Sequence, residues 1–591
     1  MFGISSSSPS SLLNQTYLNA LVTQAMAAQQ RTYEIAQTQR NQLNLTRSVY
    51  VDLRSKFSEL ASAIESLTSG IGSTFGAKSA TSSDENVVKA VAASGAAAGE
   101  YELTVNTLAK SHRVRSEQQT YVDQALGLSG TFLIGGVESR AVSNAQTVTN
   151  TVNEFSVSAS ILDGQKELGS GQYYVEVRDN NGTWQFRLVD EDGSAMSIAS
   201  VDGANTLTSG WQDLAAVAGQ TYDTGRGLQI TFGSGPYTAG LRGSGAASVT
   251  YAAQGATIEV TTSATLADIA SAINNATFAD GNEVSATIVD RRLVLTAQNT
   301  GTRHTIIASD KIGTVLSGTG AAGLGILGSG GEGDVDPADG FLYTLQQAAN
   351  TSLTVNGITV IRQKSTGLTD ILSGVTLNLY KEGAGATATL TIAPDTRRVT
   401  DQINTFLSRF NDLTAYLKAK TETARNSDGT YTRGGLANEP TFYRLRYDLL
   451  SDLIRAVPRS GETALPAGDP TSLESIGITL GADLTLSISN SGKLSAALSS
   501  NYAGVQRLFD QLMSRLETRL DPYTRSTNSL MDRYLQGIDN QIKSADASLR
   551  SLQARMTQQE EALRRQYAAL FEQILTASAN QPLVNIFSRY A

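Results

Sequence analysis

The sequence LQGIDNQIKSADASLRSLQARMTQQEEALRRQYAALFEQI, residues 535–574, decides how this chain is built. Within it an apolar residue recurs every seven positions without a break, at Leu535, Ile542, Leu549, Met556, Leu563 and Leu570. A sustained seven-residue repeat is typical of a helix that buries a narrow stripe against a partner helix. At about 1.5 Å per residue, this stretch spans about 60 Å, longer than a small domain is wide. We therefore expect a long helix that needs partners.

A second apolar stripe lies near the other end of the chain, between residues 36 and 67. Its packing candidates are Leu43, Tyr50, Leu53, Phe57, Leu60, Ile64 and Leu67. Both stripes include polar positions, such as Gln39 in the first and Gln559 in the second, while Leu552 adds to the densest apolar run of the second. Helices whose apolar stripes are interrupted by polar residues favour regulated assembly with other chains. The alternative is that each stripe belongs to an amphipathic helix packed within the bundle of its own chain.

The middle of the chain, residues 80–400, is predicted to be β-rich. Asn-Gly pairs at 181–182 and 356–357 predict two hairpins, over residues 173–188 and 351–361. A helix over 265–276 is followed by strands over 284–289 and 293–297. A similar order of residues near 368 predicts a second copy of this α+β unit, and the Gly-rich stretch 318–340 predicts a linker between the copies. The expected fold class is α+β and multidomain, with long terminal helices forming a coiled-coil leg.

Composition excludes several classes of function. The 591 residues contain no cysteine and two histidines, so thiol catalysis and thiolate metal sites are excluded. The net charge is −9 without runs of like charge, and no stretch is apolar enough to cross a membrane, so we expect neither a nucleic-acid nor a membrane partner. Residues 1–30 carry no charged side chain, unlike a secretory signal, which leaves a cytoplasmic protein or export through an unstructured Ser-rich start.

No motif for chemistry stands out. Two GxGxxG strings within 318–328 lack the strand, helix and acidic residue of a dinucleotide site. The acidic cluster of Asp334, Asp336 and Asp339 lacks the spacing of a calcium loop. We therefore predict no catalytic residue, no metal site and no cofactor.

An ordered series of motifs gives a more specific indication. Its members are residues 84–92, 98–109, 265–274, 293–301, 353–360, 368–377, 476–480, 492–498 and 505–509. In sequence and in order they resemble the flagellar filament-capping proteins, the second hook-associated protein (FliD) family. Residues 140–255 match none of these motifs and are expected to form an inserted outer domain.

The resemblance implies a domain plan. The expected parts are an export signal and first leg helix at 1–40, a helical stalk at 41–80 with 396–530, an inner head domain at 81–140 with 340–395, an outer head at 141–335, and a second leg helix with a tail at 531–591. The two apolar stripes would pack together as the leg.

The resemblance also implies a function. The chain would leave the cell by the flagellar type III secretion route, form a ring of commonly five copies at the filament tip, and promote polymerisation of flagellin. Hook–filament junction proteins and an export chaperone would be further partners. No bond would be made or broken.

Two other functions stay open from the residues. A flagellin or hook–filament junction protein also pairs terminal helices around a variable middle. An adhesin is the other alternative, in which an outer domain stacks host or surface glycans on Tyr173, Tyr174, Trp184 and Trp211; the competing role for these four side chains is packing inside hairpins.

Overall fold

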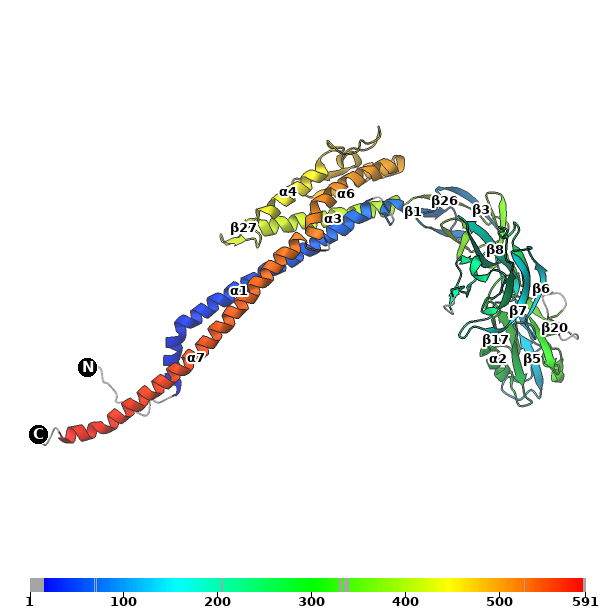
Figure 1. Cartoon of the computed structure of the whole chain (residues 1–591), viewed down its shortest axis with the longest axis horizontal. Helices are drawn as coiled ribbons and strands as arrows, with labels where there is room; N and C mark the ends of the chain where they lie inside the picture. Colours follow the sequence, from blue (N-terminus) through cyan, green and yellow to red (C-terminus); the bar gives the residue numbers. More distant parts are fainter. Residues whose placement is uncertain are drawn as a thin grey trace. The chain divides into compact units, whose positions relative to one another are not determined.

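A computed structural model describes residues 15–587, except 69, 71, 203–205, 329–331, 334–339 and 526. The chain forms two compact units, a helical unit of residues 1–77 with 394–591 and a β-rich unit of residues 78–393 (Figure 1). The predicted α+β class, with long terminal helices and a β-rich middle, is confirmed. No helix among the described residues is both long and apolar enough to cross a bilayer.

The described part of the helical unit is built from six α-helices and two short hairpins. The helices are α1 (Gln15–Leu67), α3 (Thr396–Thr421), α4 (Pro440–Ile454), α5 (Ser491–Ser500), α6 (Tyr502–Thr524) and α7 (Leu530–Phe587). The hairpins pair β27 (Thr423–Arg425) with β28 (Tyr431–Arg433), and β29 (Ile478–Leu480) with β30 (Leu486–Ile488). Side-chain caps begin several helices: the Asp395 carboxylate accepts a hydrogen bond from the Arg398 backbone N–H at 2.9 Å. The α7 backbone continues through Pro582, within the range 531–591 expected to hold the second leg helix and a tail.

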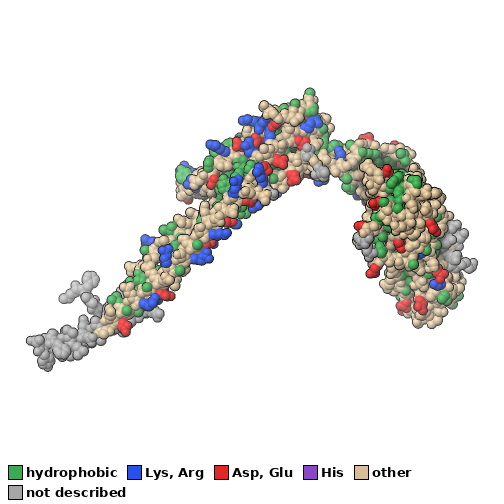
Figure 2. Space-filling model, in the orientation of Figure 1, with side chains coloured by type: hydrophobic (Ala, Val, Ile, Leu, Met, Phe, Trp, Pro, Cys, Tyr) green, Lys and Arg blue, Asp and Glu red, His purple; other side chains and the backbone are tan. Residues whose placement is uncertain are grey.

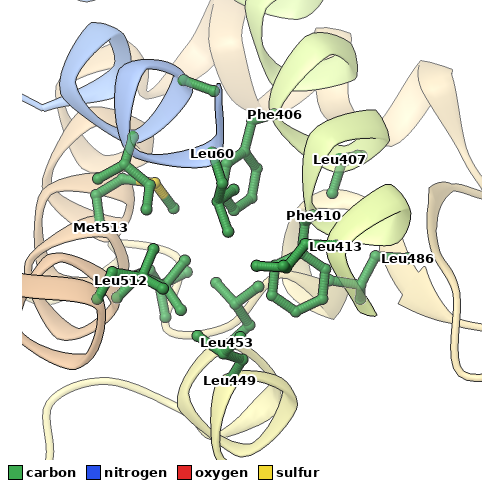
Figure 3. Close-up of a cluster of buried hydrophobic side chains, with 14 of the residues drawn as sticks. Leu60, Phe406, Leu407, Phe410, Leu413, Leu449, Leu453, Leu486, Leu512 and Met513 are labelled. Atoms are coloured by element: carbon green, nitrogen blue, oxygen red, sulfur yellow. The ribbon is translucent and has the colours of Figure 1, made fainter. Parts of the chain in front are cut away.

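A single apolar core holds α3, α4, α6 and the second half of α1 together. Figure 3 shows Leu60, Phe406, Phe410, Leu449, Leu453, Leu512 and Met513, drawn from these four helices, gathered around one centre. Aromatic contacts add to it: Phe57 stacks on Tyr523, with ring centroids 5.0 Å apart. Leu53, Phe57, Leu60 and Leu67 are fully buried. Most residues of the first apolar stripe are therefore buried inside this bundle.

A segment without long secondary structure, residues 455–472, crosses one side of α6; we call it the strap. Polar contacts fasten it to the helix. Arg515 donates to both carboxylate oxygens of Glu462, each at 2.6 Å, and Arg507 donates to both oxygens of Asp469 at 2.7 and 2.9 Å. The Arg515 side chain is only 6% exposed, so loss of Glu462 would leave a buried charge without its carboxylate partner.

Over its described residues the β-rich unit contains three separate apolar cores, built on antiparallel strand pairs such as β26 with β3. The first β core lies between two sheets, ordered β1-β26-β3-β22-β23 and β2-β25-β24. Their bounds are β1 (Lys78–Ser82), β2 (Val88–Ala92), β3 (Gly99–Thr107), β22 (Thr351–Val355), β23 (Ile358–Arg362), β24 (Leu368–Leu372), β25 (Val375–Leu379) and β26 (Thr387–Pro394).

The second β core packs α2 (Leu266–Asn274) with two four-stranded sheets, ordered β17-β18-β4-β21 and β16-β5-β19-β20. The strands are β4 (Arg113–Arg115), β5 (Gly130–Ile134), β16 (Ala256–Val260), β17 (Val284–Val289), β18 (Arg292–Ala297), β19 (Ala308–Ile312), β20 (Glu332–Gly333) and β21 (Thr344–Gln346). A capping box begins α2, since the Thr265 hydroxyl and the Asp268 carboxylate each accept the other's backbone N–H.

The third β core is formed almost wholly by residues 142–253. Its two larger sheets are ordered β12-β9-β8-β15-β6 and β13-β14-β7, beside a small β10-β11 pair. The strands are β6 (Ala141–Gln146), β7 (Val152–Ile161), β8 (Gly171–Asn180), β9 (Thr183–Asp190), β10 (Ile198–Ala199), β11 (Leu207–Thr208), β12 (Gln212–Asp213), β13 (Thr221–Asp223), β14 (Arg226–Phe232) and β15 (Ala247–Ala252). Both predicted Asn-Gly hairpins, β8–β9 and β22–β23, are confirmed, with positive φ at Asn181, Gly182, Asn356 and Gly357.

Three sequence predictions for the middle are wrong. Residues 368–372 form strand β24, not a second α2-like helix: the position that matches the Thr265 cap is Gly367, and Asp370 pairs with Arg362 instead. The stretch 318–340 is no linker where it is described, since Leu324, Ile326 and Leu327 are fully buried in the second β core. Asp334, Asp336 and Asp339 lie outside the described residues.

The third correction concerns the range 81–140, expected as one part of an inner head domain. It falls into two cores, because Phe132 and Ile134 of β5 pack with β16 and α2 in the second β core. Residues 87–105 instead pack with residues 353–392. The other domain boundaries stay predictions.

The strap predicts an acid-dependent part of the bundle's stability. The hydrogen bonds from Arg515 lower the pKa of Glu462 from 4.5 to about 2. Because the folded pKa is the lower one, this pair stabilises the fold above about pH 4.5 and is lost as pH falls toward 2. In Glu462→Gln we expect a lower urea midpoint at pH 6 and a shallower fall between pH 5 and pH 2 than in the parent. The exposed Glu517→Gln on α6 is the matched control, and equal slopes in all three proteins would contradict the prediction.

Candidate assembly interface

The leg is the part of α1 and α7 in which the two helices run antiparallel alongside each other, away from the bundle core (Figure 1). Three ion pairs join them: Arg40 Nε to Asp546 Oδ1 at 3.0 Å, Arg47 Nε to Asp539 Oδ1 at 2.6 Å, and Arg54 Nη2 to Asp532 Oδ1 at 3.2 Å. Arginines and aspartates both repeat every seven residues, in opposite directions along the chain. We call this series the Arg–Asp ladder.

The ladder determines which residues face each other. The bond from Arg47 lowers the pKa of Asp539, so this carboxylate is charged at neutral pH. Exposed ion pairs add little to stability, but a slip of three or four residues would leave all six charges without their partners. The pairing continues toward the ends of the helices, where Arg564 Nη1 donates to Asn19 Oδ1 at 2.7 Å. The ladder was missed from the sequence, although its signal, two charged heptads of opposite sign, is readable there.

The predicted packing residues separate into two groups. Tyr50, Leu53, Phe57, Leu60, Ile64, Leu67 and Leu535 are buried in the bundle core of their own chain. Tyr50 stacks on Tyr534, with ring centroids 5.2 Å apart, and meets Phe442 edge-on at 6.0 Å. These seven residues therefore pack within their own chain, as in the alternative interpretation.

The second group lies on the leg and is incompletely covered. Leu43, Ile542, Leu549, Leu552, Met556 and Leu563 are half-buried, and Leu570 is 49% exposed. On α1, Ile35 and Leu45 are exposed as well, at 60% and 67%. Two helices can bury only one stripe on each, so apolar surface remains on the outside of the pair. The leg therefore leaves apolar side chains partly or largely exposed on both helices, among polar and charged ones.

Of the four aromatic residues proposed for glycan contact, Tyr173 and Trp184 belong to the third β core, and Tyr174 and Trp211 lie outside it. Tyr173 is fully buried and its hydroxyl donates to the Gly169 carbonyl at 2.8 Å, which excludes it as a glycan contact. Trp184 is partly buried against Tyr237. The guanidinium groups of Arg178 and Arg187 lie 4.2 and 4.6 Å from the centroid of the Trp211 ring. Tyr174, on the opposite face of β8 from Tyr173, is half-buried. Glycan contact stays a prediction for Tyr174, Trp184 and Trp211.

Both histidines have structural roles. His112 is buried, and its Nδ1 accepts a hydrogen bond from the Ile306 backbone N–H at 3.1 Å, while burial lowers its pKa. His304 Nδ1 lies 2.7 Å from the Gly281 carbonyl, which fixes Nδ1 as the donor. Among the residues that the structure describes, no group of His, Asp and Glu is arranged to hold a metal ion.

Comparison with known proteins identifies the family of this chain. Residues 15–112 match the N-terminal model, and residues 348–578 the C-terminal model, of flagellar hook-associated protein 2. The A-type flagellar hook-associated protein 2 of Pseudomonas aeruginosa is 26% identical over 54% of this chain, and the B-type protein of strain PAO1 is 28% identical over 36%. The matches span 66% and 45% of the lengths of these two relatives.

Solved structures of flagellar cap proteins are also similar. The D1-D2-D3 domains of FliD from Escherichia coli are 19% identical, with a TM-score of 0.44, over 83% of this chain and 99% of that one. FliD (HAP2) from Pseudomonas aeruginosa PAO1 is 17% identical, with a TM-score of 0.27, over 58% and 99%. The two family models match in the order of the chain and together cover more than half of it, so the protein belongs to the flagellar hook-associated protein 2 (FliD) family, as the motif series predicted.

Proposed function

We propose that this protein caps the outer end of the bacterial flagellar filament and promotes the addition of exported flagellin. The family of the protein indicates this function. The half-buried apolar side chains of the leg support the proposal that this chain performs it through contacts of the leg. The cap acts as a ring of identical copies, five by resemblance, and holds subunits in position without making or breaking a covalent bond.

The leg suits contact with other helices. Its exposed apolar residues on both helices would be covered by helices of neighbouring copies, of flagellin, or of the hook–filament junction proteins that the first cap meets. Because the bundle core is complete without the leg, association and release of these partners need not disturb the bundle.

The same surface explains the proposed route out of the cell. A leg that is covered only in part forms late and reversibly, which is compatible with travel as an unfolded chain through the flagellar type III channel. Before export, an apolar surface of this kind needs protection, and we propose that an export chaperone covers it.

We propose that the third β core is an accessory module that is dispensable for elongation. It leaves the second β core and returns to it at adjacent points, since Val137 N donates to Ala253 O at 2.9 Å and Gly255 N donates to Val137 O at 2.8 Å. If the module binds host or surface glycans, it does so independently of the cap function.

The ladder can be tested by charge reversal. Arg40→Asp, Arg47→Asp and Arg54→Asp together place aspartates against aspartates, so we expect loss of the leg's helical transition and of capping. Adding Asp532→Arg, Asp539→Arg and Asp546→Arg restores three opposite-charge pairs and should recover both. Circular dichroism melting and filament elongation are measured, with the exposed Arg31, Arg533 and Arg555 changed to Asp as the control. If the variant with all six charges exchanged recovers neither the helical transition nor capping, the proposed register is wrong.

The apolar surface can be tested separately with Leu549→Ser, Leu552→Ser and Met556→Ser combined. Truncating a fully buried Leu or Met costs about 2–5 kcal/mol of unfolding free energy, and these half-buried side chains should cost less. The bundle and the β-rich unit should therefore stay folded. We expect the variant to be exported but to leave the filament tip, so that unpolymerised flagellin accumulates in the medium. Gln553→Ser, Ala554→Ser and Gln558→Ser, at exposed positions of the same segment, form the control. Normal capping by the apolar variant would remove the leg from the mechanism.

Deletion tests the module. Joining Val137 directly to Gly255 removes residues 138–254. We expect filament elongation at the parent's rate, because the apolar residues of the first and second β cores keep their packing partners. Of the residues that remain, Ala279 loses its contacts with the third β core. Any binding to a glycan array should fall to background. Loss of elongation by a stably folded deletion variant would show that the module takes part in capping.

A further inference from the structure

The bundle contains a polar cavity that the leg mechanism does not use. It has a volume of about 700 Å³ and lies between the strap and α6. Seven residues of α6, three of them arginines, line it: Arg507, Asp510, Gln511, Ser514, Arg515, Thr518 and Arg519. Arg459 of the strap lines it as well. Cavities of this size are typical of sites that receive a ligand or a partner's side chains.

The contacts within the chain already show which chemistry the cavity recognises. Arg507 and Arg515 hold the carboxylates of Asp469 and Glu462, and Arg519 Nε donates to Asp452 Oδ2 at 2.9 Å. A guanidinium carries five N–H donors, and these bonds use two of them in Arg507 and one in Arg519. Both side chains are 41% exposed. Arg519 Nη1 also lies 3.9 Å from Asp448 Oδ2. The remaining N–H groups of Arg507 and Arg519 can donate to a further carboxylate in the bidentate geometry that Arg favours.

The cavity also contains buried polar atoms without partners. Arg459 Nε, a donor, and Gln511 Oε1, an acceptor, make no hydrogen bond within the part of the chain that the structure describes. A buried donor and acceptor of this kind cost free energy unless something pairs with them. Because both atoms are buried by their own chain, the groups that an inserted segment would meet are the exposed edges of Arg507 and Arg519.

Charge indicates where such a segment comes from. Residues 78–393 contain 18 Lys and Arg against 30 Asp and Glu, whereas residues 1–77 with 394–591 contain 28 against 25. On the face shown in Figure 2, Lys and Arg side chains gather over the helical unit, and the charged side chains of the β-rich unit are mainly Asp and Glu. The chain thus carries its carboxylate excess in one unit and its arginine-lined cavity in the other.

We propose that the cavity between the strap and α6 binds a carboxylate-bearing segment from the β-rich unit of a second copy of this chain. The proposal rests on the proposed ring of copies, in which each copy offers a cavity to one neighbour and a segment to the other. Such a head-to-tail contact uses two different surfaces and closes when the ring is complete.

A photocrosslinker identifies the occupant. Thr518 is exposed and lines the cavity, so benzoylphenylalanine is placed there in the full-length chain. Equal amounts of ¹⁴N and ¹⁵N protein are mixed, irradiated and analysed by mass spectrometry, with and without flagellin. We expect crosslinks from Thr518 to residues 78–393 of the differently labelled copy, and a lower yield at high salt. Crosslinks confined to the same copy, to added flagellin or to the helical unit, or no crosslink at all, overturn the proposal.

A matched pair of variants tests the chemistry. Arg507→Gln with Arg519→Gln should lower the crosslink yield between copies at least tenfold, whereas Arg397→Gln with Arg398→Gln, an equal charge change at exposed positions of α3, should leave it unchanged. Equal yields in both variants overturn the proposal. Filament elongation by the parent protein is measured in parallel: capping without the crosslink rejects this contact alone, and failure to cap rejects the proposed function.

Discussion

The antiparallel pairing of α1 with α7 is the constraint on which the rest of the helical unit depends. It brings residues separated by nearly the whole chain into one structure, and the Arg–Asp ladder gives that pairing one register. The β-rich unit is consequently an insertion between two paired helices. Its two connections are also tied within the helical unit, where Asp395 N donates to Ala77 O at 3.0 Å.

Stability and assembly are divided along the same two helices. In the bundle, α1 is surrounded by α3, α6 and α7, so its apolar stripe is completely covered. On the leg only the partner helix remains, and Leu549, Leu552 and Met556 keep part of their surface in water. Each of the two helices thus belongs to a stable core in one part and to a partly exposed surface in the other, without a change of secondary structure.

The sequence was informative where the determining pattern is local. Heptads predicted the terminal helices, Asn-Gly pairs predicted two hairpins, and strand alternation already required Tyr173 and Tyr174 to face opposite sides of β8. It could not show that Leu53 to Leu67 is covered by its own chain, because the covering residues, such as Phe406 and Leu512, are hundreds of positions away. Leu324, Ile326 and Leu327 were misjudged because the glycines among them suggested a linker, while burial depends on contacts that composition does not encode.

The adjacent entry and exit of the third β core at Val137 and Gly255 also bear on how such chains vary. Gly136 and Gly255 lie so close that a Cβ on either would meet the other's backbone at under 3 Å, so the two connecting strands pass with no side chain between them. Since the ends of the module are fixed by this narrow neck and not by its interior, its length and fold are free to change while the scaffold stays closed. The neck is thus a natural graft point, at which evolution or a protein engineer can exchange one displayed domain for another.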